Sequence, residues 1–134
     1  MKALYPTVSY TLFIVISVAA LSVLLISVRG FAEQSQERYA KGQLECAADI
    51  VRNDIMSMYV SESSGLSKTE LPTYITGKKY IVEAQNKTVT LTMDIMGRTV
   101  SVVRTLDINI SLSGREYAPV FLDYQKDERV LVIR

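Results

Sequence analysis

Between Lys2 and Arg29 lie 26 consecutive uncharged residues, and no other feature of this sequence constrains its fold as strongly. A helix of that length, at about 1.5 Å per residue, extends roughly 39 Å, whereas the hydrocarbon core of a bilayer is roughly 30 Å thick. A secretory signal peptide has a shorter apolar core and ends in a small-residue cleavage site, but this stretch runs into Arg29-Gly30. The sequence therefore predicts a retained helix over residues 1–29 that spans a membrane or lies in the core of a filament.

The residue types that are absent exclude most catalytic chemistry. The 134 residues contain no histidine, and Cys46 is the only cysteine, so Ser-His-Asp and Cys-His sites, an internal disulfide and thiolate metal clusters cannot form. The balance of 15 basic and 14 acidic residues, without a dense basic run or a tryptophan, gives no electrostatic footprint for nucleic acid. We expect a protein that is not an enzyme, uses no cofactor or metal and binds no nucleic acid.

Residues 30–59 are predicted to continue the helix, because they contain good helix formers and no proline. Apolar residues recur at helical spacing and form a single stripe, at Ala40, Leu44, Ala47, Val51, Ile55 and Met58. We expect this amphipathic half to pack on the protein's own sheet, and contacts with neighbouring subunits are a second interpretation that is compatible with the first. Cys46 on the same helix is predicted to be a small apolar core residue.

Residues 60–134 are predicted to form an antiparallel β domain, because apolar and polar residues alternate over most of it. The stretch from Val60 to Lys79 is expected to be a loop, with a short helix within residues 66–76 that ends before Pro72. Arg104 falls at an inward position, which predicts an edge strand or a bulge there. The expected strands are 80–84, 88–95 with a turn at Gly97, 99–112, and a closing hairpin over 120–133 around the QKDER turn.

The predicted fold class is α+β. A long N-terminal hydrophobic helix (1–29) continues into an amphipathic half (30–59) that packs on a small C-terminal antiparallel β-sheet in an extracytoplasmic domain (60–134). A sheet of this size needs a helix across one face to bury enough apolar surface, and the stripe can supply it.

Two Asn-x-Ser/Thr sequons lie in the β region and make Asn86 and Asn109 candidate N-glycosylation sites. Asn86 is predicted to lie in a turn and Asn109 on the polar face of its strand, so both side chains are expected to be accessible. N-glycans are attached outside the cytoplasm, which agrees with a β domain on that side of the membrane.

The first residues, Lys2-Ala3-Leu4-Tyr5-Pro6-Thr7-Val8, followed by an apolar helix, resemble the amino-terminal region of archaeal type IV pilin-like proteins. The resemblance implies that a prepilin peptidase removes a very short leader after Lys2 or Ala3, with Leu4 beside the processed position. It also implies that an assembly machinery packs the exposed helices into a helical homo-oligomer. Accessory proteins of the related motility filament share the order of one helix and an outer β domain.

The function expected from these features is that of a structural subunit of an extracellular type IV pilus-like filament, which serves cell-surface adhesion or motility. Such a subunit is inserted in the membrane before assembly and lies at the cell surface afterwards. Small residues at Ala19, Ala20 and Ser22 permit the close helix approach that packing requires. The alternative is a membrane-anchored accessory or binding protein with an extracytoplasmic β domain that does not polymerise.

Overall fold

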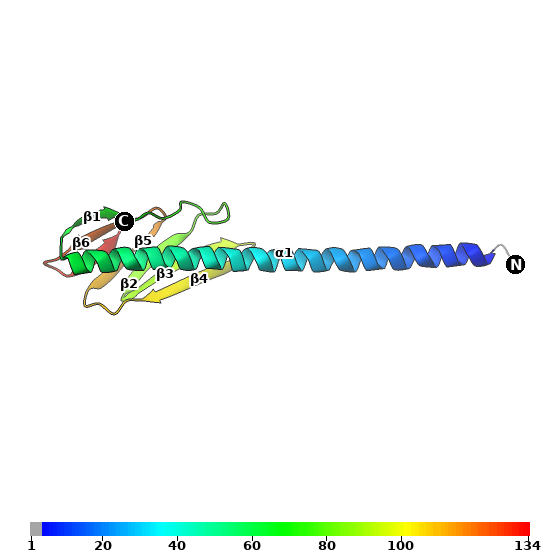
Figure 1. Cartoon of the computed structure of the whole chain (residues 1–134), viewed down its shortest axis with the longest axis horizontal. Helices are drawn as coiled ribbons and strands as arrows, with labels where there is room; N and C mark the ends of the chain where they lie inside the picture. The colour runs from blue at the N-terminus through cyan, green and yellow to red at the C-terminus, as the bar shows by residue number, and fades with distance from the viewer. Residues whose placement is uncertain (1–3) are drawn as a thin grey trace. The chain divides into compact units, whose positions relative to one another are not determined.

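The computed structural model describes residues 4–134 and has an α+β fold, as predicted from the sequence (Figure 1). One long helix, α1 (Leu4–Ser61), precedes a seven-stranded sheet. The chain divides into two compact units, Met1–Gln36 and Glu37–Arg134. The strands are β1 (Gly65–Lys68), β2 (Ile81–Asn86), β3 (Thr88–Ile95), β4 (Arg98–Thr105), β5 (Ser111–Tyr117), β6 (Phe121–Gln125) and β7 (Val130–Ile133).

Helix α1 is long because its interior contains no proline. Pro6 lies in the first turn, where a missing backbone N–H costs no helical hydrogen bond. The helix ends where Glu62 adopts a left-handed conformation with φ 51°, a common way to stop a helix. The Ser61 hydroxyl donates to the Met58 carbonyl at 3.0 Å and so satisfies one of the acceptors that the helix end leaves open.

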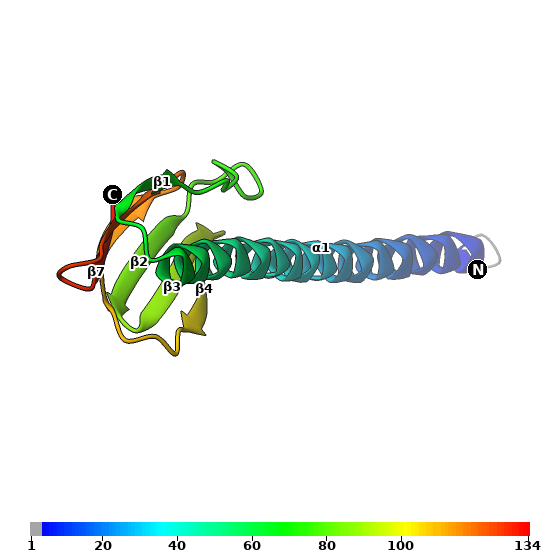
Figure 2. The ribbon, with the colours of Figure 1, turned by 60° about the vertical axis from the view of Figure 1, so that its left-hand side comes forward.

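The sheet has the strand order β1-β6-β7-β5-β2-β3-β4, so β1 and β4 are its edges. All neighbouring strands are antiparallel except β5 and β7, which are parallel. Figure 2 shows the sheet as a curved layer around the last part of α1. The predicted strand 88–95, the turn at Gly97 (φ 77°) and the closing hairpin of β6 and β7 are confirmed.

A single hydrophobic core joins one face of α1 to the inner face of the sheet. The helix contributes the predicted stripe, with Leu44, Val51 and Ile55 all at 0% exposure. The inner positions of the strands meet it, and Tyr80, Leu91 and Leu131 are equally inaccessible. The buried helix residues are Ala40, Leu44, Ala47, Ala48, Val51 and Ile55, and Met58 is partly buried beside them. The prediction that the stripe packs on the protein's own sheet is therefore confirmed.

The prediction that Cys46 belongs to the core is wrong, because its side chain is exposed. Successive helix residues are rotated by about 100°, so Cys46 lies roughly 200° from Leu44 and points away from the buried stripe. Its apolar character misled the prediction, whereas its position in the helical period gives the correct answer.

The predicted helix within residues 66–76 is also wrong, because this segment begins with β1 at the edge of the sheet. Thr69 is buried, and both its backbone N–H and its hydroxyl donate to the Val120 carbonyl, at 3.2 and 2.9 Å. Further along, the Tyr80 hydroxyl donates to the Pro72 carbonyl at 2.7 Å, and burial raises the pKa of Tyr80 to about 12. These long-range bonds hold the segment extended, so tertiary pairing overrides its local helix propensity.

The alternation over 99–112 also predicted one strand where the structure has two. β4 ends at Thr105 and β5 begins at Ser111, and the connection between them crosses from the edge of the sheet to the far side of β2. Leu106, Ile108 and Ile110 are buried along this connection. The alternation therefore records which side chains face the core, and it carries no information on whether the backbone is paired.

Arg104 lies on the edge strand β4. The sequence predicted an edge strand or a bulge here, because a charged residue occupies an inward position in the alternation of apolar and polar residues. The partner that the sequence did not reveal is Asp49 on α1, which accepts a hydrogen bond from Arg104 Nε at 2.9 Å. This hydrogen bond holds the pKa of the Asp49 carboxyl below its ordinary value of 3.8. A second ion pair joins Arg98 on β4 to Glu37 at 3.5 Å. Two ion pairs therefore fix the edge strand to the helix.

Candidate functional site

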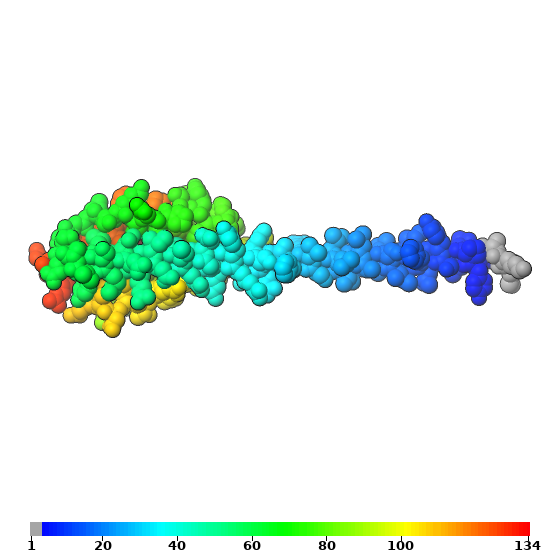
Figure 3. All heavy atoms as spheres, viewed as in Figure 1, coloured from blue at the N-terminus to red at the C-terminus, as the bar shows by residue number. Residues whose placement is uncertain are grey.

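The largest candidate site is the apolar surface of α1 over residues 4–28. These residues are exposed in the structure, and 16 of them are large hydrophobic side chains, among them Phe13 at 69% and Ile26 at 73% exposure. Figure 3 shows the side chains of this part of the chain as spheres, coloured blue to cyan. By length and composition it can cross a membrane. An exposed apolar surface of this size is typical of a segment that lipid or other chains cover.

Three hydroxyl groups on this surface are satisfied within the helix. The hydroxyls of Thr11, Ser22 and Ser27 each donate to the carbonyl four residues earlier, at 2.9, 2.8 and 2.9 Å. Burial of a hydroxyl is costly when its hydrogen bond is lost, and here the bond does not depend on water. These residues are therefore compatible with a dry environment, either lipid or the core of a helical assembly.

The apolar surface ends at the ion pair of Arg29 Nε with Glu33, which lie one turn apart on α1 at 3.1 Å. Both side chains are exposed, at 83% and 47%, and such a pair prefers water to hydrocarbon. The pair therefore marks the end of the segment that lipid or neighbouring helices can cover.

The three predicted helix-packing residues lie within the apolar surface and are exposed. Ala19 and Ser22 are three positions apart and share a face, whereas Ala20 is the neighbouring position on the helix. Small side chains allow two helix backbones to approach closely. Of the predicted processing residues, Leu4 is the first residue of α1 and is 67% exposed, and Lys2 and Ala3 lie outside the residues that the structure describes.

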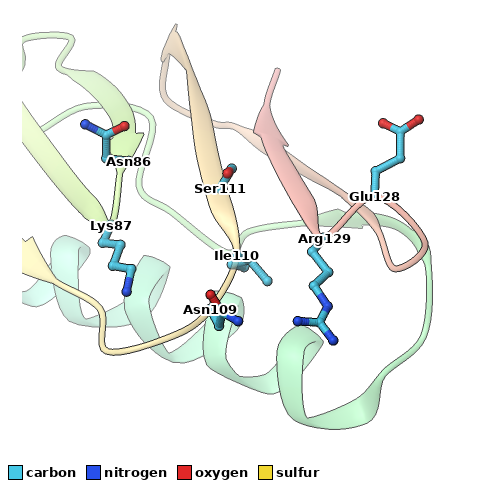
Figure 4. A pocket seen from close by; sticks show the side chains of 7 residues that line it. All are labelled: Asn86, Lys87, Asn109, Ile110, Ser111, Glu128 and Arg129. Carbon is cyan, nitrogen blue, oxygen red and sulfur yellow. The ribbon is translucent and has the colours of Figure 1, made fainter.

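A second candidate site is a shallow cavity of about 390 Å³ in the β domain, and both sequon asparagines line it (Figure 4). Asn86 ends β2 with φ 56° and, with Lys87, forms the turn that joins β2 to β3, as predicted. Asn109 is exposed as well, but it lies in the connection between β4 and β5 and not on the strand that the sequence suggested. The fold thus brings together two motifs that are 23 residues apart in the sequence.

The same cavity contains two cationic residues that no sequence motif marks as site residues, Lys87 and Arg129. Backbone hydrogen bonds fix the positions of both, since the Leu106 N–H donates to the Lys87 carbonyl at 2.8 Å and the Ser111 N–H to the Arg129 carbonyl at 2.9 Å. Arg129 belongs to the predicted QKDER turn, and only the topology shows that this turn meets the β2–β3 turn. Across residues 4–134, no group of three acidic or cysteine side chains is placed to hold a metal ion.

Comparison with protein families matches residues 1–134 to a family of unknown function, DUF7266. No curated protein and no solved structure matches the chain.

Proposed function

We propose that this chain, which belongs to the DUF7266 family, is a structural subunit of an extracellular type IV pilus-like filament that is assembled by packing of its N-terminal helices. The observation that carries the proposal is the uncovered apolar surface of α1. The proposal places residues 4–28 in the filament core and the β domain on the outside, where it serves adhesion or motility.

The size of the uncovered surface argues that it is always covered in the cell. Burial of one large aliphatic or aromatic side chain is favourable by about 1.5 to 3 kcal/mol. Sixteen such side chains are exposed between Leu4 and Val28. Their combined exposure to water therefore costs on the order of 20 kcal/mol or more, which exceeds the roughly 5 to 15 kcal/mol by which a typical domain is stable.

Two features favour other helices over lipid alone as the final cover. The small residues Ala19, Ala20 and Ser22 assist close helix contact, and they add nothing to simple insertion into lipid, for which larger apolar residues are at least as good. The resemblance of residues 2–8 to archaeal type IV pilin-like amino termini supports the same assignment. On this proposal a prepilin peptidase and an assembly machinery act on the membrane-inserted chain before it reaches the cell surface.

The second candidate is a membrane-anchored accessory or binding protein with an extracytoplasmic β domain that does not polymerise. It is supported by the observation that α1 is long and apolar enough to cross a membrane. Both candidates place the amino terminus in the cytoplasm and the β domain outside, and they differ only in whether the helices assemble.

Electron microscopy of surface material sheared from cells distinguishes the two. For this experiment an epitope tag is added after Arg134, and immunogold labelling shows whether any fibre contains the tagged chain. Cells that lack the gene are the control, because any fibre made of another protein would persist in them. We expect fibres that are labelled along their whole length. Full labelling of the membrane fraction, with no labelled fibre, would support the anchored accessory protein.

A further inference from the structure

The cavity between the β2–β3 turn and the start of β7 has a distribution of charge that the filament proposal does not use. In Figure 4 the side chains of Lys87, Asn109 and Arg129 extend to the same side, with Asn109 between the two cations. The carboxylate of Glu128 and the amide of Asn86 extend to the other side in this view. Two positive charges therefore flank an amide that can donate and accept hydrogen bonds.

Neither cation is neutralised by a neighbouring side chain. Among residues 4–134 the acidic partners of the ion pairs serve other cations, and neither Lys87 nor Arg129 has an ionic partner or a side-chain hydrogen bond. Like charges on two fixed turns repel one another, and an anion between them removes that repulsion. Leu106 in the β4–β5 connection and Ser111 at the start of β5 bond to the backbones of Lys87 and Arg129, so the two turns that carry the cations are preorganised for such a ligand.

A second cavity of about 480 Å³ adjoins the first and shares Asn109 and Arg129 with it. Its lining includes the ring of Tyr59 at the end of α1 and Lys126, which is already paired with Glu62 at 3.0 Å. The second cavity is thus close to neutral and rich in hydroxyl and amide groups, whereas the first has a net positive charge. A ligand that extends through both would carry its anionic group at one end and neutral polar groups at the other.

We propose that the two cavities bind an acidic oligosaccharide, with a carboxylate or sulfate group between Lys87 and Arg129 and neutral sugar hydroxyls against the second cavity. Amide, hydroxyl and tyrosine groups in a shallow polar depression suit a saccharide, and neither cavity has the apolar lining that a hydrophobic ligand needs. The saccharide has two sources, a free or cell-surface glycan or a glycan attached to Asn109 of the chain itself. The proposal goes beyond the filament function and does not depend on assembly.

The test uses the full chain in detergent micelles, produced in a host that attaches no N-glycans. 3′-Sialyllactose and its neutral methyl ester are the probes, because the acid carries one terminal carboxylate beside a neutral lactose and the ester replaces that charge with a methyl ester. Titration calorimetry at low ionic strength measures their binding. We expect the acid to bind at least about tenfold more tightly than the ester, and 0.5 M salt to remove most of the difference.

Lys87→Gln and Arg129→Gln are each expected to weaken binding of the acid about fivefold or more. Lys79→Gln is the matched control, because Lys79 is an exposed lysine that lines neither cavity, and it should leave the affinity unchanged. Both test side chains are exposed, so the fold should survive, and an unaltered near-ultraviolet circular dichroism spectrum verifies this. Equal binding of acid and ester, no binding of the acid, or full affinity in both variants would overturn the proposal.

A second arm identifies the source of the saccharide. The chain is purified from its own organism, and mass spectrometry of the peptide that contains Asn109 shows whether it carries a glycan. A preparation glycosylated at Asn109 should not bind 3′-sialyllactose, whereas the unglycosylated chain from the first host binds it, which identifies the attached glycan as the ligand. An unmodified Asn109 with binding intact identifies a separate glycan as the ligand. Undiminished binding by a glycosylated preparation would contradict the proposed placement.

Discussion

Leu44→Ala is expected to destabilise the β domain strongly, because the Leu44 side chain joins α1 to the sheet. Leu44 is fully buried, with 0% exposure, in the core that the helix and the strands share. Removal of a buried leucine side chain costs the lost burial plus the cavity it leaves, about 2 to 5 kcal/mol in total. For a unit near 100 residues, about 1 kcal/mol lowers Tm by about 4 to 8 °C, so we expect a fall of at least about 8 °C.

The matched control for this prediction is Cys46→Ala on the same helix. Cys46 is exposed and two residues away, so its replacement should change the free energy of unfolding by less than about 0.5 kcal/mol. Near-ultraviolet circular dichroism of the full chain in detergent measures Tm through Tyr80 and Tyr124, whose rings are buried in the β domain, whereas Tyr5 and Tyr10 of the detergent-covered helix are exposed. Equal losses in the two variants, or a larger loss for Cys46→Ala, would show that the buried face of α1 has been assigned incorrectly.

Three further predictions concern the β domain. Asp49→Asn should make the fall of Tm below pH 3.8 shallower. The hydrogen bond from Arg104 lowers the pKa of Asp49 in the folded state below the value of 3.8 for a free carboxyl. The ionised carboxylate therefore stabilises the fold above pH 3.8, and this stabilisation is lost as the pH falls through the lowered pKa. A Tm series from pH 6 to pH 2 measures this, and an unchanged slope would contradict it. Gly114→Ala should cost at least about 2 kcal/mol in urea unfolding, because φ is 124° there and the new Cβ would meet the Ile133 carbonyl oxygen. A neutral result would refute the close approach of β5 and β7. Protease added to intact cells should digest residues 30–134, and protection until lysis would reverse the proposed orientation.

The sequence predicted those parts of the fold that depend on periodicity. A period near 3.6 identified the buried face of α1, and a period of 2 identified β3 and the hairpin of β6 and β7. It could not separate β4 from β5, because Leu106, Ile108 and Ile110 alternate in the same way whether or not the backbone is paired. The edge strand β1 has only four residues and owes its conformation to bonds with distant strands, which no local pattern contains.

Of the two candidate sites, one could be predicted from the sequence and the other could not. The apolar surface of α1 is continuous in sequence, so its extent from Leu4 to Val28 could be predicted from the absence of charge alone. The cavity of Asn86, Asn109 and Arg129 is assembled from three separate connections, and its existence depends on the strand order. The sequons marked two of its residues, but no sequence signal indicated that the cation at 129 lies beside them.

Assembly of Ala20→Leu, compared with that of the parent and of Ala20→Arg, tests whether close packing of the α1 helices holds a filament together. Ala20 lies on the exposed apolar surface of α1. Leucine inserts into a bilayer at least as well as alanine, but its bulk prevents close helix approach, whereas arginine costs roughly 2.5 to 3.5 kcal/mol at the centre of a membrane helix. Membrane fractionation and electron microscopy should show that Ala20→Leu is inserted normally but forms few or no fibres, and that Ala20→Arg fails in both. If Ala20→Leu forms fibres as abundantly as the parent, close packing of the helices at this position does not hold a filament together, and the proposed assembly through the N-terminal helices is contradicted.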